Sequence, residues 1–262
     1  MIIEYYILNP TGNITALVID NGIDIKNYNT VCREIMNRHS NVEQVGFVNF
    51  RLNNPYLRMT GGEFCGNATM STAVLYHRLK DNESATVNIT VYGSKRDFSV
   101  NIIKEDARYL TSICIDRPTD ISNYTFEING RSYCFPVVFM EGISHIIADK
   151  SLNKNDAQAI IKKYCDVLKI PAMGIMLYDK KTGDLEPIVY VKSCDTLFFE
   201  NSCISGSCAL SSYLAENNTG KTEISLIQPG GTVRTLSDSN SDKIELFGSV
   251  IIENHLFMEI QL

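Results

Sequence analysis

The chain of 262 residues consists of two halves in which the same sequence features recur in the same order. Each half has an apolar strand pattern, a glycine turn, an amphipathic helix pattern, a strand that opens on glycine and a helix that begins at a cysteine. These shared positions are Gly12 and Gly142 at the turns, Gly46 and Gly174 at the strands, and Cys65 and Cys203 at the helices. The recurrence predicts two lobes that share one architecture.

The amphipathic segments of the two halves carry one apolar face each. Apolar side chains recur at helical spacing over residues 27–38 and again over residues 155–168, which is typical of a helix that packs on a sheet. The strands that follow correspond as well: residues 85–92 and 98–103 of the first half match residues 223–227 and 232–236 of the second.

The helices that begin at the two cysteines have an unusual composition. Residues 67–75 and 205–214 are rich in Ala, Ser, Thr and Gly and carry few charges, whereas exposed helices carry Lys and Glu on their solvent side. Small uncharged side chains let other backbone approach closely. We therefore expect an α+β fold with two pseudo-symmetric lobes, each a curved, mostly antiparallel sheet wrapped around a central helix.

The lobe boundaries follow from this repeat. We expect an N-terminal lobe over residues 1–117, which contains Cys65, and a C-terminal lobe over residues 118–254, which contains Cys203. A last strand over residues 255–262 would return to the N-terminal lobe and complete it.

Composition excludes several function classes. The net charge of −6 and the lack of a dense Lys/Arg run make nucleic acid and anionic membranes poor partners. No apolar stretch is long enough to span a bilayer, and the first eight residues lack the basic region of a signal peptide. We expect a cytoplasmic protein.

Six of the eight cysteines lie outside the two equivalent positions, and their spacing does not resemble a metal site, because no Cys-x-x-Cys occurs. Five lie in apolar stretches and are interpreted as small buried hydrophobic residues, namely Cys32, Cys114, Cys134, Cys165 and Cys194. We expect no metal.

Cys65 and Cys203 differ from these five because each precedes a helix. The N–H groups and the dipole at a helix N-terminus stabilise a thiolate. Internal symmetry that brings two such thiols face to face, in a cleft between the lobes, would suit proton transfer on opposite sides of one carbon. The alternative is that both are buried structural cysteines.

Particular segments add a family resemblance that covers essentially the whole chain. Glu-Phe-Cys-Gly-Asn at 63–67, Asn-Ser-Cys-x-x-Gly-Ser at 201–207 and Gln-Pro-Gly-Gly at 228–231 resemble the diaminopimelate epimerase-like superfamily. Within it, Asn-Pro-Thr-Gly-Asn at 9–13, Glu-Gln-Val-Gly-Phe at 43–47 and the long segment 63–71 are most similar to histidine racemases of opine-metallophore (staphylopine-type) biosynthesis.

The resemblance implies amino-acid racemisation without pyridoxal phosphate, metal or any other cofactor. Cys65 and Cys203 would be the catalytic pair, one removing the α-proton as thiolate and the other supplying a proton as thiol. The resemblance also implies substrate contacts at Asn13, Glu43, Gln44, Glu200 and Asn201. The N–H groups at the two helix starts are expected to bind the α-carboxylate, at Gly66, Asn67, Ser205 and Gly206, and His145 is a further candidate substrate ligand. Among these, small residues at the helix starts let a carboxylate approach the backbone.

The sequence departs from diaminopimelate epimerases at one informative place. Those enzymes carry a Glu-Arg pair before the second cysteine, whereas residues 193–200 contain no Arg. A distal carboxylate would have no bidentate partner in this segment, so an uncharged or weakly basic side chain fits better. A carboxylate at Glu43 could accept a hydrogen bond from an imidazole, which favours histidine.

Alternatives remain open at single residues and for the whole chain. Glu43 could be a solvated loop acid, Asn13 a turn residue and His145 a hydrogen-bonded core residue. The activity could instead be racemisation or epimerisation of another amino acid, of the diaminopimelate or proline type. A non-catalytic binding module of the same fold is a third hypothesis. The expected partner is a small amino acid, and a homodimer is compatible with the resemblance.

Overall fold

The computed structural model describes residues 1–52, 54–80, 85–216 and 218–261. The chain divides into one unit formed by Met1–Ile113 with Phe247–Leu262 and a second formed by Cys114–Leu246. It passes from one unit to the other within β7 (Arg108–Asp116) and β16 (Lys243–Glu259).

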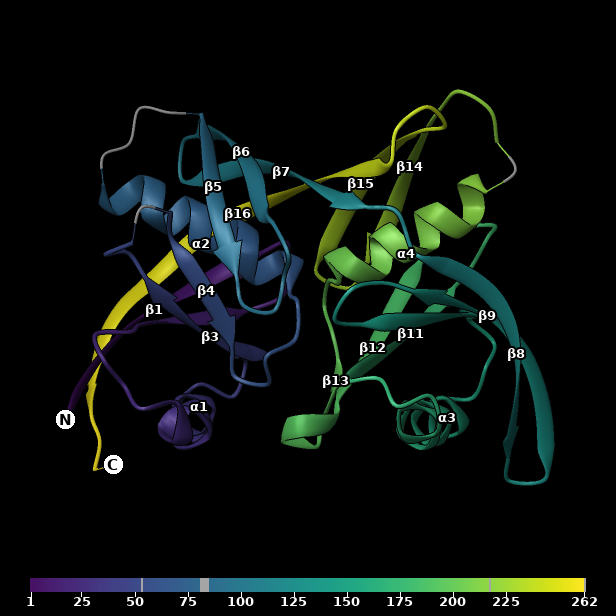
Figure 1. Ribbon diagram of the computed structural model, residues 1–262, viewed down its shortest axis with the longest axis horizontal. Coiled ribbons are helices and arrows are strands. Elements are labelled where there is room, and N and C mark those ends of the chain that lie inside the picture. The colour runs from purple at the N-terminus through teal and green to yellow at the C-terminus, as the bar shows by residue number, and fades with distance from the viewer. Residues whose placement is uncertain (53, 81–84, 217, 262) are drawn as a thin grey trace. The chain divides into compact units, whose positions relative to one another are not determined.

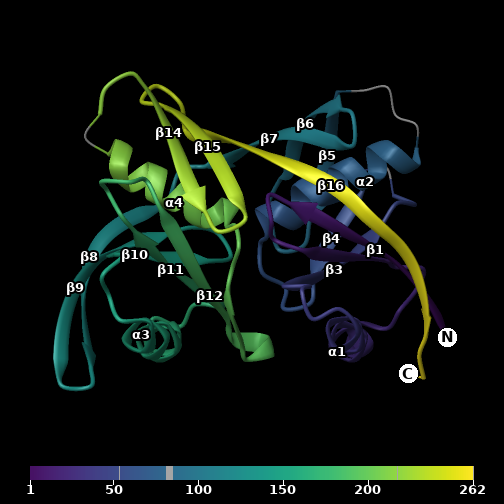
Figure 2. The same ribbon diagram turned by 180° about the vertical axis from the view of Figure 1, so that it is seen from behind.

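The observed division differs in detail from the boundaries expected at 117 and 255. The difference is largest near the C-terminus, because β16 is one long strand that pairs antiparallel with β1 (Ile2–Pro10) from Ile2 opposite Glu259 to Pro10 opposite Val250. The two strands run side by side (Figure 2), so the segment that joins the first unit begins well before residue 255. Leu262, the end of the predicted strand, lies outside the described residues.

The first unit is a ring of strands. β1 to β7 follow one another in sheet order, and β16 pairs next to both β7 and β1, which closes an eight-stranded barrel. The remaining strands are β2 (Thr15–Ile19), β3 (Gln44–Asn49), β4 (Tyr56–Met59), β5 (Thr86–Val91) and β6 (Asp97–Glu105). Helix α2 (Gly66–Leu79) contacts five of these strands, and its residues 66–75 are buried. Small side chains such as Ala68 and Ala73 allow this close packing.

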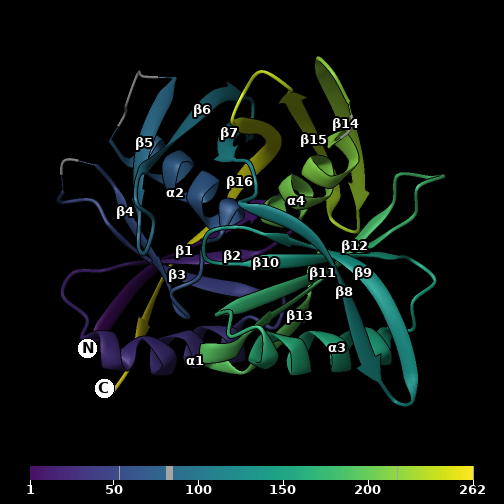
Figure 3. The same cartoon turned by 45° about the vertical axis from the view of Figure 1, so that its right-hand side comes forward.

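Helix α1 (Tyr28–Arg38), which follows the short helix η1 (Ile25–Asn27), packs on the opposite face of β1, β2 and β3 (Figure 3). Val31 and Ile35 are fully buried there, and the Tyr28 ring stacks on Phe47 with centroids 3.5 Å apart. The amphipathic pattern over residues 27–38 therefore predicts this helix and its apolar face correctly.

The second unit contains a six-stranded sheet in the order β13-β12-β11-β10-β9-β8 and a hairpin, β14 with β15. The strands are β8 (Asp120–Ile128), β9 (Arg131–Phe139), β10 (Ser144–Asp149), β11 (Ala172–Tyr178), β12 (Leu185–Val191), β13 (Thr196–Phe199), β14 (Lys221–Gln228) and β15 (Gly231–Asp238). Helix α3 (Lys154–Val167) covers one face of the sheet, the short helix η2 (Lys192–Cys194) precedes β13, and α4 (Ile204–Ala215) packs against β9, β10, β11, β14 and β15 (Figure 1).

The two units share some local pairings, as the sequence predicts, although one is a closed barrel and the other a six-stranded sheet with a hairpin. In each, a parallel pair follows an antiparallel one: β2 with β3 in the first unit and β10 with β11 in the second. The equivalent glycines lie in register with a partner on the preceding strand, Gly46 opposite Leu17 and Gly174 opposite His145. The α+β class with mostly antiparallel sheet is confirmed; the parallel pairs also include β4 with β5.

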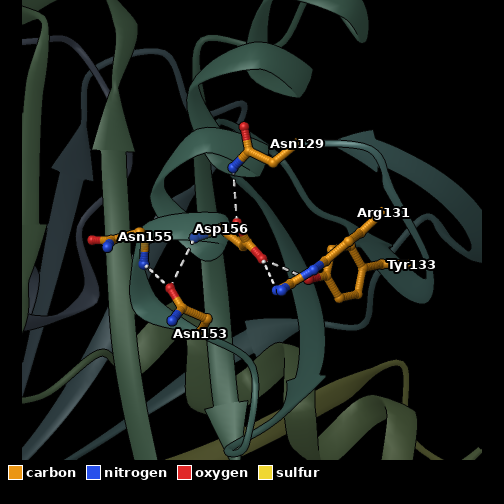
Figure 4. Close-up of polar contacts among 6 residues, drawn as sticks. All are labelled: Asn129, Arg131, Tyr133, Asn153, Asn155 and Asp156. Carbon is orange, nitrogen blue, oxygen red and sulfur yellow. Dashed lines mark hydrogen bonds and ion pairs between the residues drawn. The ribbon is translucent and has the colours of Figure 1, made fainter.

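The start of α3 is tied to the β8–β9 hairpin by a buried carboxylate (Figure 4). Asp156 accepts hydrogen bonds from the Asn129 amide at 2.9 Å, the Arg131 guanidinium at 3.1 Å and the Tyr133 hydroxyl at 2.6 Å. Asn153 caps the helix by accepting from the backbone N–H of residues 155 and 156. The hydrogen bonds to the Asp156 carboxylate hold its pKa below the ordinary value, and the bond from Tyr133 contributes most.

Across the described part of the chain, the helices are too short or too polar for a transmembrane span.

Candidate active site

Cys65 is the N-cap of α2. Its backbone is extended, with φ −133° and ψ 110°, and its sulfur accepts a hydrogen bond from the Ala68 N–H at 3.3 Å. The Thr69 hydroxyl donates to the Cys65 carbonyl oxygen at 2.8 Å. Cys65 occupies the N-cap position, where Ser, Thr, Asp or Asn is usual. Its thiol therefore lies where the helix offers N–H donors.

A chain of side-chain hydrogen bonds leads from Cys65 to Glu43. The Cys65 thiol donates to Gln44 Oε1 at 3.1 Å, and Gln44 Nε2 donates to Asn13 Oδ1 and, at 3.2 Å, to the Thr15 hydroxyl. Asn13 Nδ2 then donates to Glu43 Oε2 at 3.1 Å. Because an ionised carboxylate accepts hydrogen bonds and cannot donate them, Glu43 sets the orientation of both amides. Gln44 therefore presents a carbonyl oxygen to the sulfur.

The structure thus brings together four of the predicted site residues of the first unit. Asn13 is fully buried and follows a turn in which Gly12 has φ +88°, a conformation that glycine adopts without strain. Gly66 and Asn67 are buried in the first turn of α2. Thr15, whose hydroxyl contacts Gln44 and Asn13, was not among the predicted residues; its place two residues after Asn13, at the start of β2, could have indicated it.

Cys203 is the N-cap of α4 with nearly the same backbone, φ −133° and ψ 108°. Its sulfur accepts from the Gly206 N–H at 3.4 Å, and the Ser207 hydroxyl donates to its carbonyl oxygen at 2.7 Å. Gln228 anchors the cap: its Oε1 accepts from the Cys203 N–H at 2.8 Å and its Nε2 donates to the Ser207 hydroxyl at 2.9 Å. The sequence motif at 228–231 did not indicate this role.

The surroundings of Cys203 oppose ionisation. Only 4% of the residue is exposed, and burial raises the pKa of its thiol well above the ordinary value. The charge of Glu200 and a hydrogen bond to that carboxylate act in the same direction, whereas bonds from the Ser205 hydroxyl and the Gly206 N–H lower the pKa. The helix end therefore favours the thiolate, as expected, but burial outweighs it.

The other predicted residues of the second unit surround this cap or lie near it. A Cβ at Gly206 would lie 2.1 Å from the Met176 sulfur, so a larger residue there would displace the Met176 side chain. Ser205 is buried, with its Oγ 3.5 Å from the Cys203 sulfur. Asn201 is exposed, and its carbonyl oxygen accepts from the Gly230 N–H at 2.8 Å.

His145 lies on β10 with none of its surface exposed. Its Nε2 lies 3.1 Å from the Ser205 Oγ, and burial lowers the imidazole pKa to about 3. The ring is therefore neutral at physiological pH. The structure puts this side chain in contact with Ser205, the residue that also contacts Cys203.

Comparisons with known proteins agree with the resemblance. The family described as "Histidine racemase CntK N-terminal domain" matches residues 2–255. A histidine racemase of Fusobacterium nucleatum is 32% identical over 266 residues, covering 98% of this chain and 98% of that protein. A histidine racemase of Staphylococcus aureus is 26% identical and covers 90% of this chain and 89% of that protein.

Solved structures share the fold at low sequence identity. A predicted epimerase from Pseudomonas aeruginosa has a TM-score of 0.72 at 12% identity and covers 98% of this chain and 99% of its own. A hydroxyproline epimerase from Agrobacterium vitis has a TM-score of 0.66 at 9% identity and covers 98% and 92%.

Proposed function

The chain belongs to the histidine racemase family, and we propose that it interconverts L- and D-histidine without a cofactor, using Cys65 and Cys203 as the two acid–base groups. The observation that carries this proposal is the repeat itself. A full-length match to histidine racemases coincides with two helices, each capped by a cysteine in the same backbone conformation.

The proposed chemistry is a two-base proton transfer. One cysteine, as thiolate, takes the α-proton, so that an S–H bond forms as the C–H bond breaks. The electron pair left on the α-carbon is delocalised into the carboxylate, and the other cysteine donates its thiol proton to the opposite face. The cysteines end with their protonation states exchanged. The proposal requires both thiols to reach one α-carbon.

The carbanion needs strong stabilisation because the α-hydrogen is far less acidic than a thiol. We propose that the backbone N–H groups and dipoles at the starts of α2 and α4 bind the α-carboxylate and stabilise the charge that develops on it. The residues proposed for this are Gly66, Asn67, Ser205 and Gly206, which begin the two helices.

The side-chain pocket is proposed at Glu43. Its carboxylate, held by the Asn13 amide, would accept a hydrogen bond from the substrate imidazole. Gln44, Glu200 and Asn201 are proposed as further substrate contacts. His145 is proposed to act on the substrate site indirectly, through its contact with Ser205. We also propose the finer architecture expected from the sequence, a curved sheet around one central helix in each unit, and a cytoplasmic location.

Chiral chromatography tests the proposed function. Purified protein is incubated with L-histidine in the presence of a reductant and a chelator, with no cofactor added. We expect D-histidine to accumulate until the enantiomers are equal, and turnover to be faster than with alanine, proline, lysine or diaminopimelate. Equal or faster turnover of another substrate in the panel would change the assigned substrate. No turnover of any substrate would contradict racemisation.

A further inference from the structure

We propose that His145 is a positioning residue for Cys203: its imidazole orients the Ser205 hydroxyl so that this hydroxyl donates to the Cys203 sulfur. The inference rests on the proposed function, since it assigns a role at one of the two proposed acid–base groups. It differs from the direct substrate contact that the sequence suggested for His145.

The contacts form a short chain within the second unit. Nε2 of His145 lies 3.1 Å from the Ser205 Oγ, and that oxygen lies 3.5 Å from the Cys203 Sγ. All three residues are buried, with 0%, 5% and 4% of their surfaces exposed. In such an environment, hydrogen bonds in series strengthen one another.

The tautomer of His145 fixes the direction of this chain. Its Nδ1 is buried without a hydrogen-bond partner, and buried unpaired N–H groups are rarer than buried unpaired acceptors. The proton of the neutral ring therefore belongs on Nε2, where it is donated to Ser205. Because the Ser205 oxygen then accepts from His145, its own hydrogen is left to point at the sulfur, where it stabilises a thiolate.

The repeat gives an internal comparison that separates this role from packing. His145 lies in register with Gly174, and the equivalent position of the first unit is Leu17, in register with Gly46. A Cβ added at Gly174 would lie 2.2 Å from His145 Nδ1, and one added at Gly46 would lie 2.9 Å from Leu57 Cδ1 and 3.1 Å from Leu17 Cδ2. Both side chains thus fill the space above a glycine. Leucine suffices for that packing in one unit, so the imidazole of the other serves the hydrogen bond to Ser205.

Two substitutions of His145 separate the hydrogen bond from the packing. His145→Leu places the first unit's residue in the second and removes the donor. His145→Gln keeps an N–H at a position close to that of Nε2. We expect His145→Leu to lower kcat/KM for L-histidine about tenfold and His145→Gln only about threefold, since one hydrogen bond is at stake. Equal losses in the two variants would overturn the proposal.

The coupling between His145 and Ser205 is the second test. Ser205→Ala should lower kcat/KM about tenfold, and adding His145→Leu to it should lower the value by no more than about twofold further, because both changes break one chain. Multiplication of the two losses would show that His145 acts independently of Ser205. His39→Asn removes an imidazole that is hydrogen-bonded to Tyr5 in the first unit. It is the matched control and should leave kcat/KM unchanged, alone and in the Ser205→Ala background.

The pH dependence distinguishes positioning from a general loss of structure. Glu200 acts on the Cys203 sulfur directly and stays the same in every variant, and substrate titration is common to all. In His145→Leu, loss of the donor should move to higher pH the limb of the kcat/KM profile that reports Cys203: the ascending limb for the enantiomer from which Cys203 removes the proton, and the descending limb for the other enantiomer. A lower rate with an unmoved limb would overturn the proposal.

A substrate-free titration keeps this inference separable from the proposed function. Thiolate absorbance is titrated in Cys65→Ser and in the Cys65→Ser, Cys203→Ser double variant, and the difference isolates Cys203. Adding His145→Leu should move the midpoint of this Cys203 titration to higher pH, and adding His145→Gln should leave it in place. This result would support the His145 role even if histidine were not the substrate; no shift with either variant would contradict it.

Discussion

The two cysteine-capped helices are alike in backbone and different in what reaches their sulfurs. Cys65 and Cys203 have almost the same φ and ψ, and each sulfur accepts from the N–H three residues later. At Cys65 the thiol donates to the carbonyl oxygen of Gln44. At Cys203 the Ser205 hydroxyl and the Glu200 carboxylate both act on the sulfur.

A helix N-terminus alone therefore does not set the protonation state of a thiol. The Gly206 N–H lowers the pKa of Cys203, yet burial raises it by more. At Cys65, the amide chain that begins at Glu43 presents a carbonyl oxygen to which the thiol donates. The two equivalent helix starts therefore surround their sulfurs with different groups, and the proposed two-base mechanism needs one thiol and one thiolate at each moment of its cycle.

The largest expected effect comes from the cysteines themselves. Cys65→Ser and Cys203→Ser should each lower the turnover of histidine by more than about a hundredfold, because a hydroxyl is a poor base at neutral pH. Racemisation is followed by chiral chromatography, and circular dichroism verifies that each variant is folded. Cys134→Ser, which replaces an exposed cysteine, is the control. A variant that keeps a tenth of the wild-type turnover would remove its cysteine from the mechanism.

A smaller loss of activity, greater for histidine than for other substrates, is expected at Glu43. This residue ends the series of side-chain hydrogen bonds that starts at Cys65. Glu43→Gln should remove the charge-assisted hydrogen bond proposed to the substrate imidazole, a loss of roughly 1.5–3 kcal/mol, or about one to two orders of magnitude in kcat/KM for histidine. It also frees the Asn13 and Gln44 amides to reorient, so a lesser loss should extend to other substrates.

The substrate panel separates these two contributions. Residual activity with alanine reports the effect on Cys65, and the excess loss with histidine reports recognition of the imidazole. Glu105→Gln, an exposed acid of the same unit, serves as the control. Equal losses for every substrate would show that Glu43 supports the site and does not select histidine.

The smallest expected effect is on thermal stability, and it follows from a comparison of α1 with α3. The N-cap of α1, Asn27, makes no side-chain cap hydrogen bond, whereas α3 begins at a capped Asn153 and at Asp156, which accepts three donors. Asp156→Asn should lower the melting temperature at neutral pH, because at least one donor loses its acceptor.

The pH dependence of this effect has a definite sign. The pKa of Asp156 is lower in the folded state than its ordinary value of 3.8. Its contribution is therefore present above pH 3.8 and disappears as the pH falls through the folded-state pKa. Melting curves of Asp156→Asn and wild type should converge in acid, while the exposed control Asp242→Asn should match wild type throughout. A constant difference at all pH values would contradict the assigned role of the charge.

The repeat explains why much of the fold could be predicted from the sequence. Patterns over 27–38 and 155–168 correspond to α1 (Tyr28–Arg38) and α3 (Lys154–Val167), and both cysteines lie at the predicted helix starts. These are local features that spacing and composition record. The β8–β9 hairpin was not predicted, because polar residues line much of it and its pairing with α3 depends on Asp156.

The side-chain contacts of the site could not be predicted in the same way. Gln44 reaches Cys65 and Gln228 reaches Cys203 across many residues of sequence, and only the folded sheets bring them together. The burial of Cys203 likewise depends on strands that lie far from it in the chain. Motifs therefore indicate candidate site residues, and tertiary packing decides what each one contacts.

The most direct test of the two-base claim is racemisation of L-histidine in D2O, stopped early. If Cys65 and Cys203 act on opposite faces, the D-histidine formed should carry deuterium at the α-carbon, while the remaining L-histidine stays protiated. The same pattern should hold with D-histidine as the starting enantiomer. Early deuterium in the starting enantiomer, in both directions and at a rate comparable to that in the product, would contradict the assignment of two separate bases.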